Sequence, residues 1–220
     1  MTATRTPLHV MWNPDRLRVD LEGAVRVVFD LDGTLYDTRD FERPALAAVV
    51  KWLRQHSGRP LDGLLEALWL RRETDRHRPG LFDELLAQYG LPVSLGSECA
   101  LLFHDYPGNE LAHSSSLKEQ LNGLRAAGTR LALVTNGRPV LQRRKLHWLG
   151  LEEMFDSCVC CDPGIPQQLK PSSWAWSQLA TWRSGLLTTY VGDDPVDAEF
   201  AHQGQARFIG FAFRSPSYAD

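Results

Sequence analysis

Four short apolar runs constrain the fold of this chain more than any other feature of its sequence. They lie at residues 25–31, 131–137, 187–193 and 206–213, and β-branched and aromatic side chains are frequent in them. Runs of this length and composition are typical of buried strands. Helical patterns lie between them, and short buried strands that alternate with helices form a parallel sheet covered on both faces. The sequence therefore predicts an α/β fold with a doubly wound parallel sheet.

Two of the helices between these runs are clearly marked. Leu117, Leu121 and Leu124 fall on one helical face, and Gly128 follows them as a stop signal. Pro139 comes directly after the second run, at a position that suits the first turn of another helix. Both patterns support a layer of helices against the predicted sheet.

A long stretch after the first run shows only helical patterns. Four helical segments occur within residues 38–112, and polar or glycine-containing breaks separate them. We interpret this stretch as a small all-helical cap domain inserted after the first strand of the core. The α/β core then consists of residues 1–37 and 113–220, and the sequence leaves the structure of the first 24 residues open.

The composition restricts the partners of the chain. Its 220 residues are 43% hydrophobic and 23% charged, which is typical of a globular protein. A net charge of −3 provides no broad positive field, so we expect neither a nucleic acid nor a membrane surface as partner. No segment approaches the roughly 18–20 consecutive apolar residues of a membrane span, so we expect a soluble protein. The oligomeric state stays open.

Three of the four cysteines cluster in a segment that alternates like a strand. Cys158, Cys160 and Cys161 lie within four residues, whereas a zinc site normally requires a second pair of ligands elsewhere. We interpret them as reduced, small apolar strand residues. The N-terminus lacks the apolar core of a secretory signal, and together these features predict a reducing, cytoplasmic location.

Polar side chains gather where the predicted strands end, and ligands of open parallel sheets bind at the carboxyl ends of the strands. Lys170 lies between the second and third runs, in a Lys-Pro pair. The other polar residues follow the first, second and third runs in turn: Asp30 and Asp32; Thr135 and Asn136; Asp193, Asp194 and Asp197. We expect these groups to converge on one crevice.

The residue types in this crevice suit phosphoryl transfer. Carboxylates held close together repel one another unless a cation lies among them, and oxygen ligands in loops suit Mg²⁺. A carboxylate can also attack phosphorus and form an aspartyl phosphate. The Thr135 hydroxyl, backbone N–H groups near Asn136 and the Lys170 ammonium match the charge of a transferring phosphoryl group. Each motif alone also has a structural interpretation as a turn or helix cap, but their order favours metal-assisted phosphoryl transfer.

This succession of motifs resembles the haloacid dehalogenase (HAD) superfamily, and within it the small-molecule phosphatases with a Rossmann-like core and a helical cap. The four motifs are FDLDGTLYDT, LVTNG, LKP and VGDDPVD, and the resemblance extends over residues 25–213. Two departures are visible. Ser172 stands where an acidic residue often follows the Lys-Pro, and CCDPG offers only Asp162 where relatives carry an acidic pair. Both departures affect the shape of loops more than the roles of the residues in the four motifs.

The resemblance implies a role for each polar residue. Asp30 is then the nucleophile and Asp32 the general acid/base. Thr135, Asn136 and Lys170 hold the phosphoryl group. Mg²⁺ is then held by the carboxylates of Asp30 and Asp193 and by the backbone carbonyl of Asp32. Asp194 or Asp197 is either a further ligand or a support behind the ligands.

These roles describe a Mg²⁺-dependent phosphatase that hydrolyses a small phosphorylated metabolite, a nucleotide or a sugar phosphate, through an aspartyl-phosphate intermediate. A phosphomutase is an alternative, because it differs mainly in how the cap admits water. A dehalogenase is disfavoured by Asp32, since a halide leaves without a proton. A catalytically silent binding protein is the third alternative. The cap also contains a cationic stretch, which consists of Arg71, Arg72, Arg76, His77 and Arg78. This stretch either binds an acidic substrate or forms a solvated loop.

Overall fold

The computed structural model describes residues 8–11, 21, 23–74, 80–108, 111, 115–179 and 188–212. The chain forms two compact units. One comprises Met1–Asp37 together with Ala112–Asp220, and the other comprises Thr38–Leu111.

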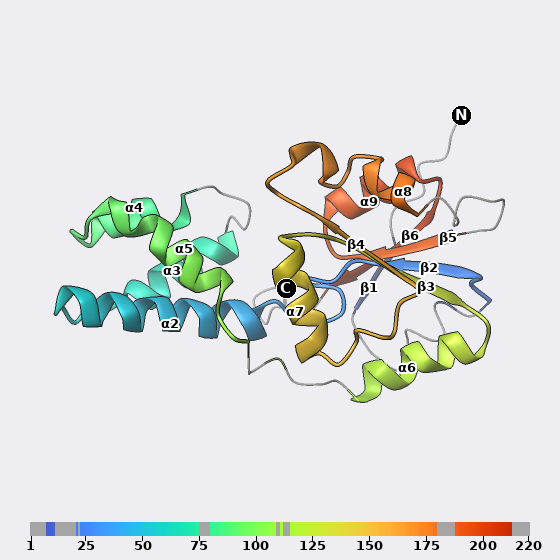
Figure 1. Ribbon diagram of the computed structural model, residues 1–220, viewed down its shortest axis with the longest axis horizontal. Coiled ribbons are helices and arrows are strands. Elements are labelled where there is room, and N and C mark those ends of the chain that lie inside the picture. The colour runs from blue at the N-terminus through green and yellow to red at the C-terminus, as the bar shows by residue number, and fades with distance from the viewer. Residues whose placement is uncertain are drawn as a thin grey trace. The chain divides into compact units, whose positions relative to one another are not determined.

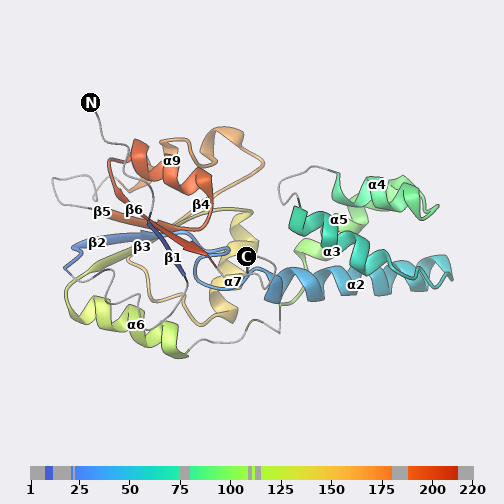
Figure 2. The same cartoon turned by 180° about the vertical axis from the view of Figure 1, so that it is seen from behind.

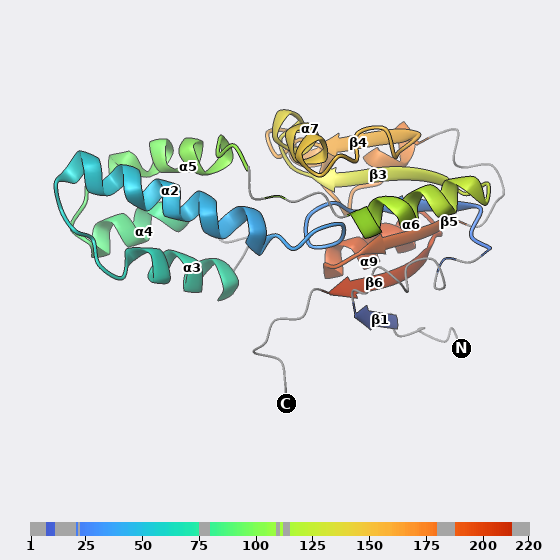
Figure 3. The same ribbon diagram turned by 90° about the horizontal axis from the view of Figure 1, so that it is seen from below.

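The larger unit is built on a six-stranded sheet in which every strand pair is parallel, in the order β1-β6-β5-β2-β3-β4. Figure 3 shows arrowheads of β1, β3 and β6 pointing to the same edge of this sheet. The strands are β1 (Leu8–Met11), β2 (Arg26–Phe29), β3 (Arg130–Asn136), β4 (Ser157–Cys161), β5 (Thr188–Gly192) and β6 (Arg207–Ala212). The predicted doubly wound parallel sheet is confirmed, and the cysteine-rich segment is strand β4.

The strand order reverses at β2, the first of the predicted strands. From β2 the chain builds outward through β3 and β4 on one side, and then through β5 and β6 on the other. Such a reversal opens a crevice at the carboxyl ends of the central strands. Strand β1, in the stretch whose structure the sequence left open, pairs with β6 at the outer edge.

Helices cover both faces of the sheet, as the alternating pattern predicts (Figures 1 and 2). Helix α6 lies against one face, and α8 and α9 lie against the other. The helices are α6 (Ser115–Ala126), α7 (Pro139–Trp148), α8 (Trp174–Gln178) and α9 (Pro195–Gln203), with a short 3-10 helix η2 (Pro166–Gln168). Pro139 opens α7 as expected, because the first helical position needs no backbone donor.

The layers are held together by side chains with almost no exposed surface. Leu117, Leu121 and Leu124, the predicted apolar face of α6, are all buried. On the opposite face, the rings of Trp176 and Phe200 stack with centroids 4.8 Å apart. This packing fixes the strand ends from both sides.

The smaller unit contains helices and no strand among its described residues. Its elements are α2 (Arg39–Ser57), α3 (Leu64–Thr74), α4 (Leu81–Gln88), the 3-10 helix η1 (Val93–Leu95) and α5 (Gly96–His104). Phe103 of α5 packs edge-on against Phe41 of α2 and Phe82 of α4, with ring centroids 5.9 and 6.3 Å apart. Among the described helices of either unit, none has the length and apolar character needed to cross a bilayer.

Two of the five cationic residues singled out in the cap are paired within this unit. Arg71 contacts Glu84 at 2.7 Å, and Arg72 contacts the buried Glu42 at 2.7 Å. Residues 76–78, which carry the other three, lie outside the described part of the chain. The described part of the stretch therefore stabilises the helical unit through ion pairs.

We expect Leu121→Ala to destabilise the larger unit. Leu121 has no exposed surface, and truncating a fully buried leucine typically costs about 2–5 kcal/mol, because a cavity remains. Val140 on α7 is 69% exposed, so Val140→Ala is a matched control that changes stability by less than about 0.5 kcal/mol. Chemical denaturation followed by tryptophan fluorescence measures both values, and equal effects would contradict the packing described here.

Candidate active site

The first part of the site is the turn that follows β2. The Asp30 N–H donates to the Val191 carbonyl at 2.8 Å, which ties this residue to β5 just beyond the end of β2. Gly33, three residues after Asp30, has a φ of +80°, a region that glycine enters without steric cost. The turn therefore holds Asp30 beside the end of β5.

Glycine at position 33 is also required by close packing. A Cβ at this position would lie 2.0 Å from Oδ2 of Asp193. The Thr34 hydroxyl donates to the other Asp193 oxygen at 3.4 Å. The turn after β2 thus receives the Asp193 carboxylate from the end of β5.

Helix α9 begins at Pro195, and Asp194, the residue after Asp193, is its N-cap. Asp194 accepts a hydrogen bond from the Val196 N–H at 2.8 Å, and its own N–H donates to Oδ2 of Asp197 at 3.2 Å. This reciprocal arrangement is a capping box. Asp194 therefore has a structural role at the start of the helix, and it directs Asp197 inward.

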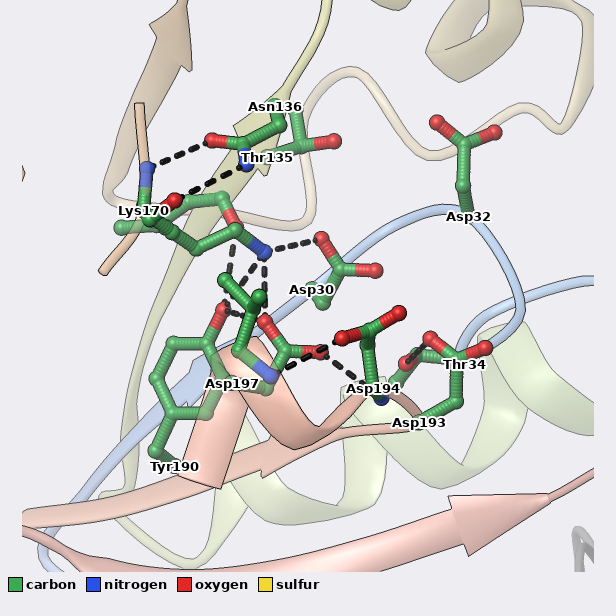
Figure 4. Close-up of polar contacts among 12 residues, drawn as sticks. Asp30, Asp32, Thr34, Thr135, Asn136, Lys170, Tyr190, Asp193, Asp194 and Asp197 are labelled. Carbon is green, nitrogen blue, oxygen red and sulfur yellow. Dashed lines mark hydrogen bonds and ion pairs between the residues drawn. The ribbon is translucent and has the colours of Figure 1, made fainter. Parts of the chain in front are cut away.

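Lys170 connects the carboxylates from different strand ends (Figure 4). Its ammonium, almost fully buried, donates to Asp30 at 2.7 Å and to Asp197 at 2.6 Å. It also lies 3.1 Å from the hydroxyl of Tyr190, a buried residue of β5. Burial by itself would lower the pKa of Lys170, but Asp30, Tyr190 and Asp197 outweigh it and raise that pKa well above its usual value.

Three carboxylates form a cluster suited to a divalent cation. Oxygen atoms of Asp30, Asp193 and Asp197 all lie within 4.8 Å of one another. Burial raises the pKa of Asp30 well above its usual range; Lys170 opposes this, whereas the other carboxylates reinforce it. Both oxygens of Asp197 already accept hydrogen bonds, from Lys170 and from the Asp194 N–H. These hydrogen bonds tie Asp197 to Lys170 and to the start of α9.

The last residues of β3, Thr135 and Asn136, lie at the same edge of the sheet. The Asn136 side chain pairs with the backbone of Lys170: its oxygen accepts from the Lys170 N–H at 2.9 Å, and its amide faces the Lys170 carbonyl at 3.5 Å. The Gly137 N–H donates to the Cys161 carbonyl. In this structure the Asn136 side chain therefore orients Lys170. The Thr135 hydroxyl accepts from Gln142 at 2.7 Å.

Asp32 is held apart from this cluster. Figure 4 shows its carboxylate pointing away from Asp30 and Lys170. It contacts Lys145 at 2.6 Å and Gln142 at 2.7 Å, both on α7, and it also accepts from the hydroxyl of Tyr36. Burial would raise the pKa of Asp32, but the Lys145 charge and these hydrogen bonds lower it. Asp30 and Asp32 thus lie in different electrostatic environments, and their pKa values shift in opposite directions.

Sequence reasoning missed four of these residues. Tyr190 lies inside an apolar strand, so its pattern indicates only burial. Tyr36 lies four residues after Asp32, and Gln142 and Lys145 lie in a basic stretch of α7 that looks like a solvated surface. The spacing of three between Gln142 and Lys145, just after the second motif, was the available signal, since it places both on one helical face.

Comparison with known proteins agrees with this geometry. The sequence profile of the haloacid dehalogenase-like hydrolases matches residues 26–204. The chain therefore belongs to the haloacid dehalogenase-like hydrolase family.

Two phosphatases and one solved structure are among the proteins similar to this chain. A phosphoglycolate phosphatase from Cereibacter sphaeroides is 33% identical over 202 residues, which cover 84% of each chain. A glyceraldehyde 3-phosphate phosphatase from Pyrococcus abyssi is 30% identical over 62% of this chain and 59% of its own. Among solved structures, a haloacid dehalogenase-like protein from Streptococcus pneumoniae has a TM-score of 0.59 at 19% identity and covers 88% of both chains. The last comparison concerns the fold alone.

We expect Gly33→Ala to weaken binding of a divalent cation. The new methyl group would displace the Asp193 carboxylate, and disturbing the support of a ligand typically lowers metal affinity by about 10–100-fold. Gly23→Ala is a matched control, because Gly23 also has a positive φ of 75° but nothing within 4 Å of the added Cβ. Isothermal titration with Mg²⁺ compares the variants. Equal affinities in the two would separate Asp193 from the metal site.

Proposed function

We propose that this protein is a Mg²⁺-dependent phosphatase that hydrolyses a small phosphorylated metabolite through an aspartyl phosphate. One observation carries the proposal: a buried lysine holds Asp30 within a group of three carboxylates, beside the hydroxyl-bearing end of β3. Such a cluster suits a nucleophilic carboxylate, a cation and a phosphoryl group together. Relatives that cover most of the chain are phosphatases, which supports the same reaction.

The reaction proceeds in two half-reactions. An oxygen of Asp30 attacks phosphorus in line, the bond to the leaving-group oxygen breaks, and Asp32 gives that oxygen its proton. Asp32 then takes a proton from water, which attacks phosphorus and breaks the bond to Asp30. Phosphate leaves and both aspartates are restored. Thr135 and Lys170 bind the phosphoryl oxygens, and Asn136 keeps Lys170 in place through its backbone.

The residues present fit Mg²⁺. The carboxylates of Asp30 and Asp193, which lie in one cluster, would supply hard oxygen ligands of the kind that this ion prefers. By resemblance to the family, the backbone carbonyl of Asp32 would supply another. When bound, the ion offsets the repulsion among the carboxylates and neutralises charge on the phosphoryl group. Asp197 and Asp194 support the ligands from behind, through Lys170 and the helix cap.

The substrate class follows from the relatives, whose names point to two- and three-carbon phosphate esters. We propose 2-phosphoglycolate and glyceraldehyde 3-phosphate as the first compounds to assay, with nucleotides and sugar phosphates in the same panel. Asp32 favours this reaction over dehalogenation, because an alkoxide leaving group needs a proton and a halide does not.

Metal dependence is the first test. EDTA should abolish phosphate release, and Mg²⁺ should restore it. Ca²⁺ should restore little, because its 6–8 ligands at longer distances would misplace the nucleophile. A malachite green assay measures all three conditions. Full activity in EDTA would remove the metal from the proposed mechanism.

The second test separates the two aspartates. Asp30→Asn should abolish turnover of every substrate, because it removes the nucleophile. Asp32→Asn should lower kcat/KM for an alkyl phosphate by about 10²–10⁴-fold, the usual worth of general acid–base catalysis. For p-nitrophenyl phosphate the loss in kcat/KM should be small, because nitrophenolate leaves without a proton. Rapid-quench kinetics should then show one burst of nitrophenolate, since the phosphoenzyme lacks its base. Equal losses without a burst would mean that Asp32 is not the acid.

A further inference from the structure

Asp32 lies outside the cluster of Asp30, Asp193 and Asp197, and its side-chain contacts come from other parts of the fold. Lys145 and Gln142 approach it from consecutive turns of α7, a helix that begins three residues after the end of β3. Lys145 and Gln142 are both buried, whereas the Asp32 side chain is 27% exposed. A buried cation and a buried amide thus point toward a carboxylate that stays accessible to a ligand.

Each oxygen of Asp32 has its own partner on this helix. Oδ1 accepts from the Lys145 ammonium at 2.6 Å and also from Tyr36, and Oδ2 accepts from the Gln142 amide at 2.7 Å. Hydrogen bonds to both oxygens restrict the rotation of a carboxylate, and charge-assisted bonds are the stronger kind. These contacts therefore set both the place and the orientation of the Asp32 carboxylate.

Gln142 also joins Asp32 to the phosphoryl-binding hydroxyl. Its amide nitrogen carries two protons, and it lies 2.7 Å from Oδ2 of Asp32 and 2.7 Å from the Thr135 hydroxyl oxygen. Since Thr135 accepts from the amide here, the proton of its own hydroxyl stays available for a phosphoryl oxygen. A Cβ at Gly137 would lie 2.6 Å from the Gln142 side chain, so the glycine of the second motif makes room for this bridge.

We propose that Lys145 and Gln142 are positioning residues: they hold Asp32 in register with Thr135, so that the acid/base stands where the leaving-group oxygen departs from the bound phosphoryl group. This inference rests on the proposed phosphatase function. It predicts that loss of either residue impairs the step that needs proton transfer and spares phosphoryl transfer to a leaving group that needs none. A purely structural role predicts equal losses for both kinds of substrate.

The experiment measures kcat/KM in Mg²⁺ for an alkyl phosphate, 2-phosphoglycolate or glyceraldehyde 3-phosphate, and for p-nitrophenyl phosphate. This ratio reports the formation of the phosphoenzyme, the step in which the leaving group is protonated. Lys145→Met should lower it about 10–100-fold for the alkyl phosphate, as expected for a misplaced catalytic group, and less than about 3-fold for p-nitrophenyl phosphate. Lys145→Arg should recover most of the loss, because it keeps the charge.

Two further variants guard against a folding defect. Gln142→Leu removes the bridge without leaving a buried charge unpaired, and it should show the same dependence on the leaving group. Arg143→Met removes one positive charge from the exposed face of the same helix and should leave both substrates unaffected. Thermal unfolding of each variant separates loss of activity from loss of structure.

A double-mutant cycle gives the sharpest outcome. If Lys145 acts through Asp32, adding Lys145→Met to Asp32→Asn should change kcat/KM for the alkyl phosphate by less than about 3-fold, because coupled residues are not additive. Additive effects, or equal losses for both substrates in Lys145→Met and Gln142→Leu, would overturn the inference while the phosphatase function stands. A wild-type protein that releases phosphate from neither substrate would instead refute the proposed function, and the inference with it.

Discussion

The contact of one buried ammonium, Lys170, with the carboxylates of Asp30 and Asp197 is the interaction on which the site depends. The three residues are separated by 140 and 27 positions in the chain, and only the parallel sheet brings them together. Charges this deeply buried are strongly unfavourable without partners. The ammonium therefore requires the two carboxylates, and the carboxylates require the ammonium. Tyr190 and the Asn136 side chain complete the arrangement by holding the ammonium and the backbone of Lys170.

Close approach at the strand ends is made possible by glycine. At Gly192 an added Cβ would lie 2.4 Å from Asp197, and at Gly33 it would lie 2.0 Å from Asp193. The carboxylates therefore come nearer to the backbone of β5 and of the turn after β2 than any larger residue would permit. Crowding of this kind concentrates negative charge, which explains why a cation is the natural complement of the site.

Asp30 and Asp32 show how identical groups close together in sequence can lie in different environments. Burial and neighbouring carboxylates raise the pKa of Asp30, whereas Lys145, Tyr36 and Gln142 lower the pKa of Asp32 against the effect of burial. Two residues apart in sequence, these groups face different elements, one toward β5 and one toward α7.

The sequence by itself determined the parallel α/β sheet, its strands other than β1 and the apolar face of α6, because local periodicity and strand-end turns depend on neighbouring residues alone. It also determined which residues gather at the carboxyl edge, since parallel strands all end there. Only the tertiary structure decided which of them touch. It joined Asn136 to the Lys170 backbone, made Asp194 a helix cap, and brought Gln142 and Lys145 to Asp32. Those contacts depend on side-chain directions and distances between elements far apart in the chain, which no local pattern encodes.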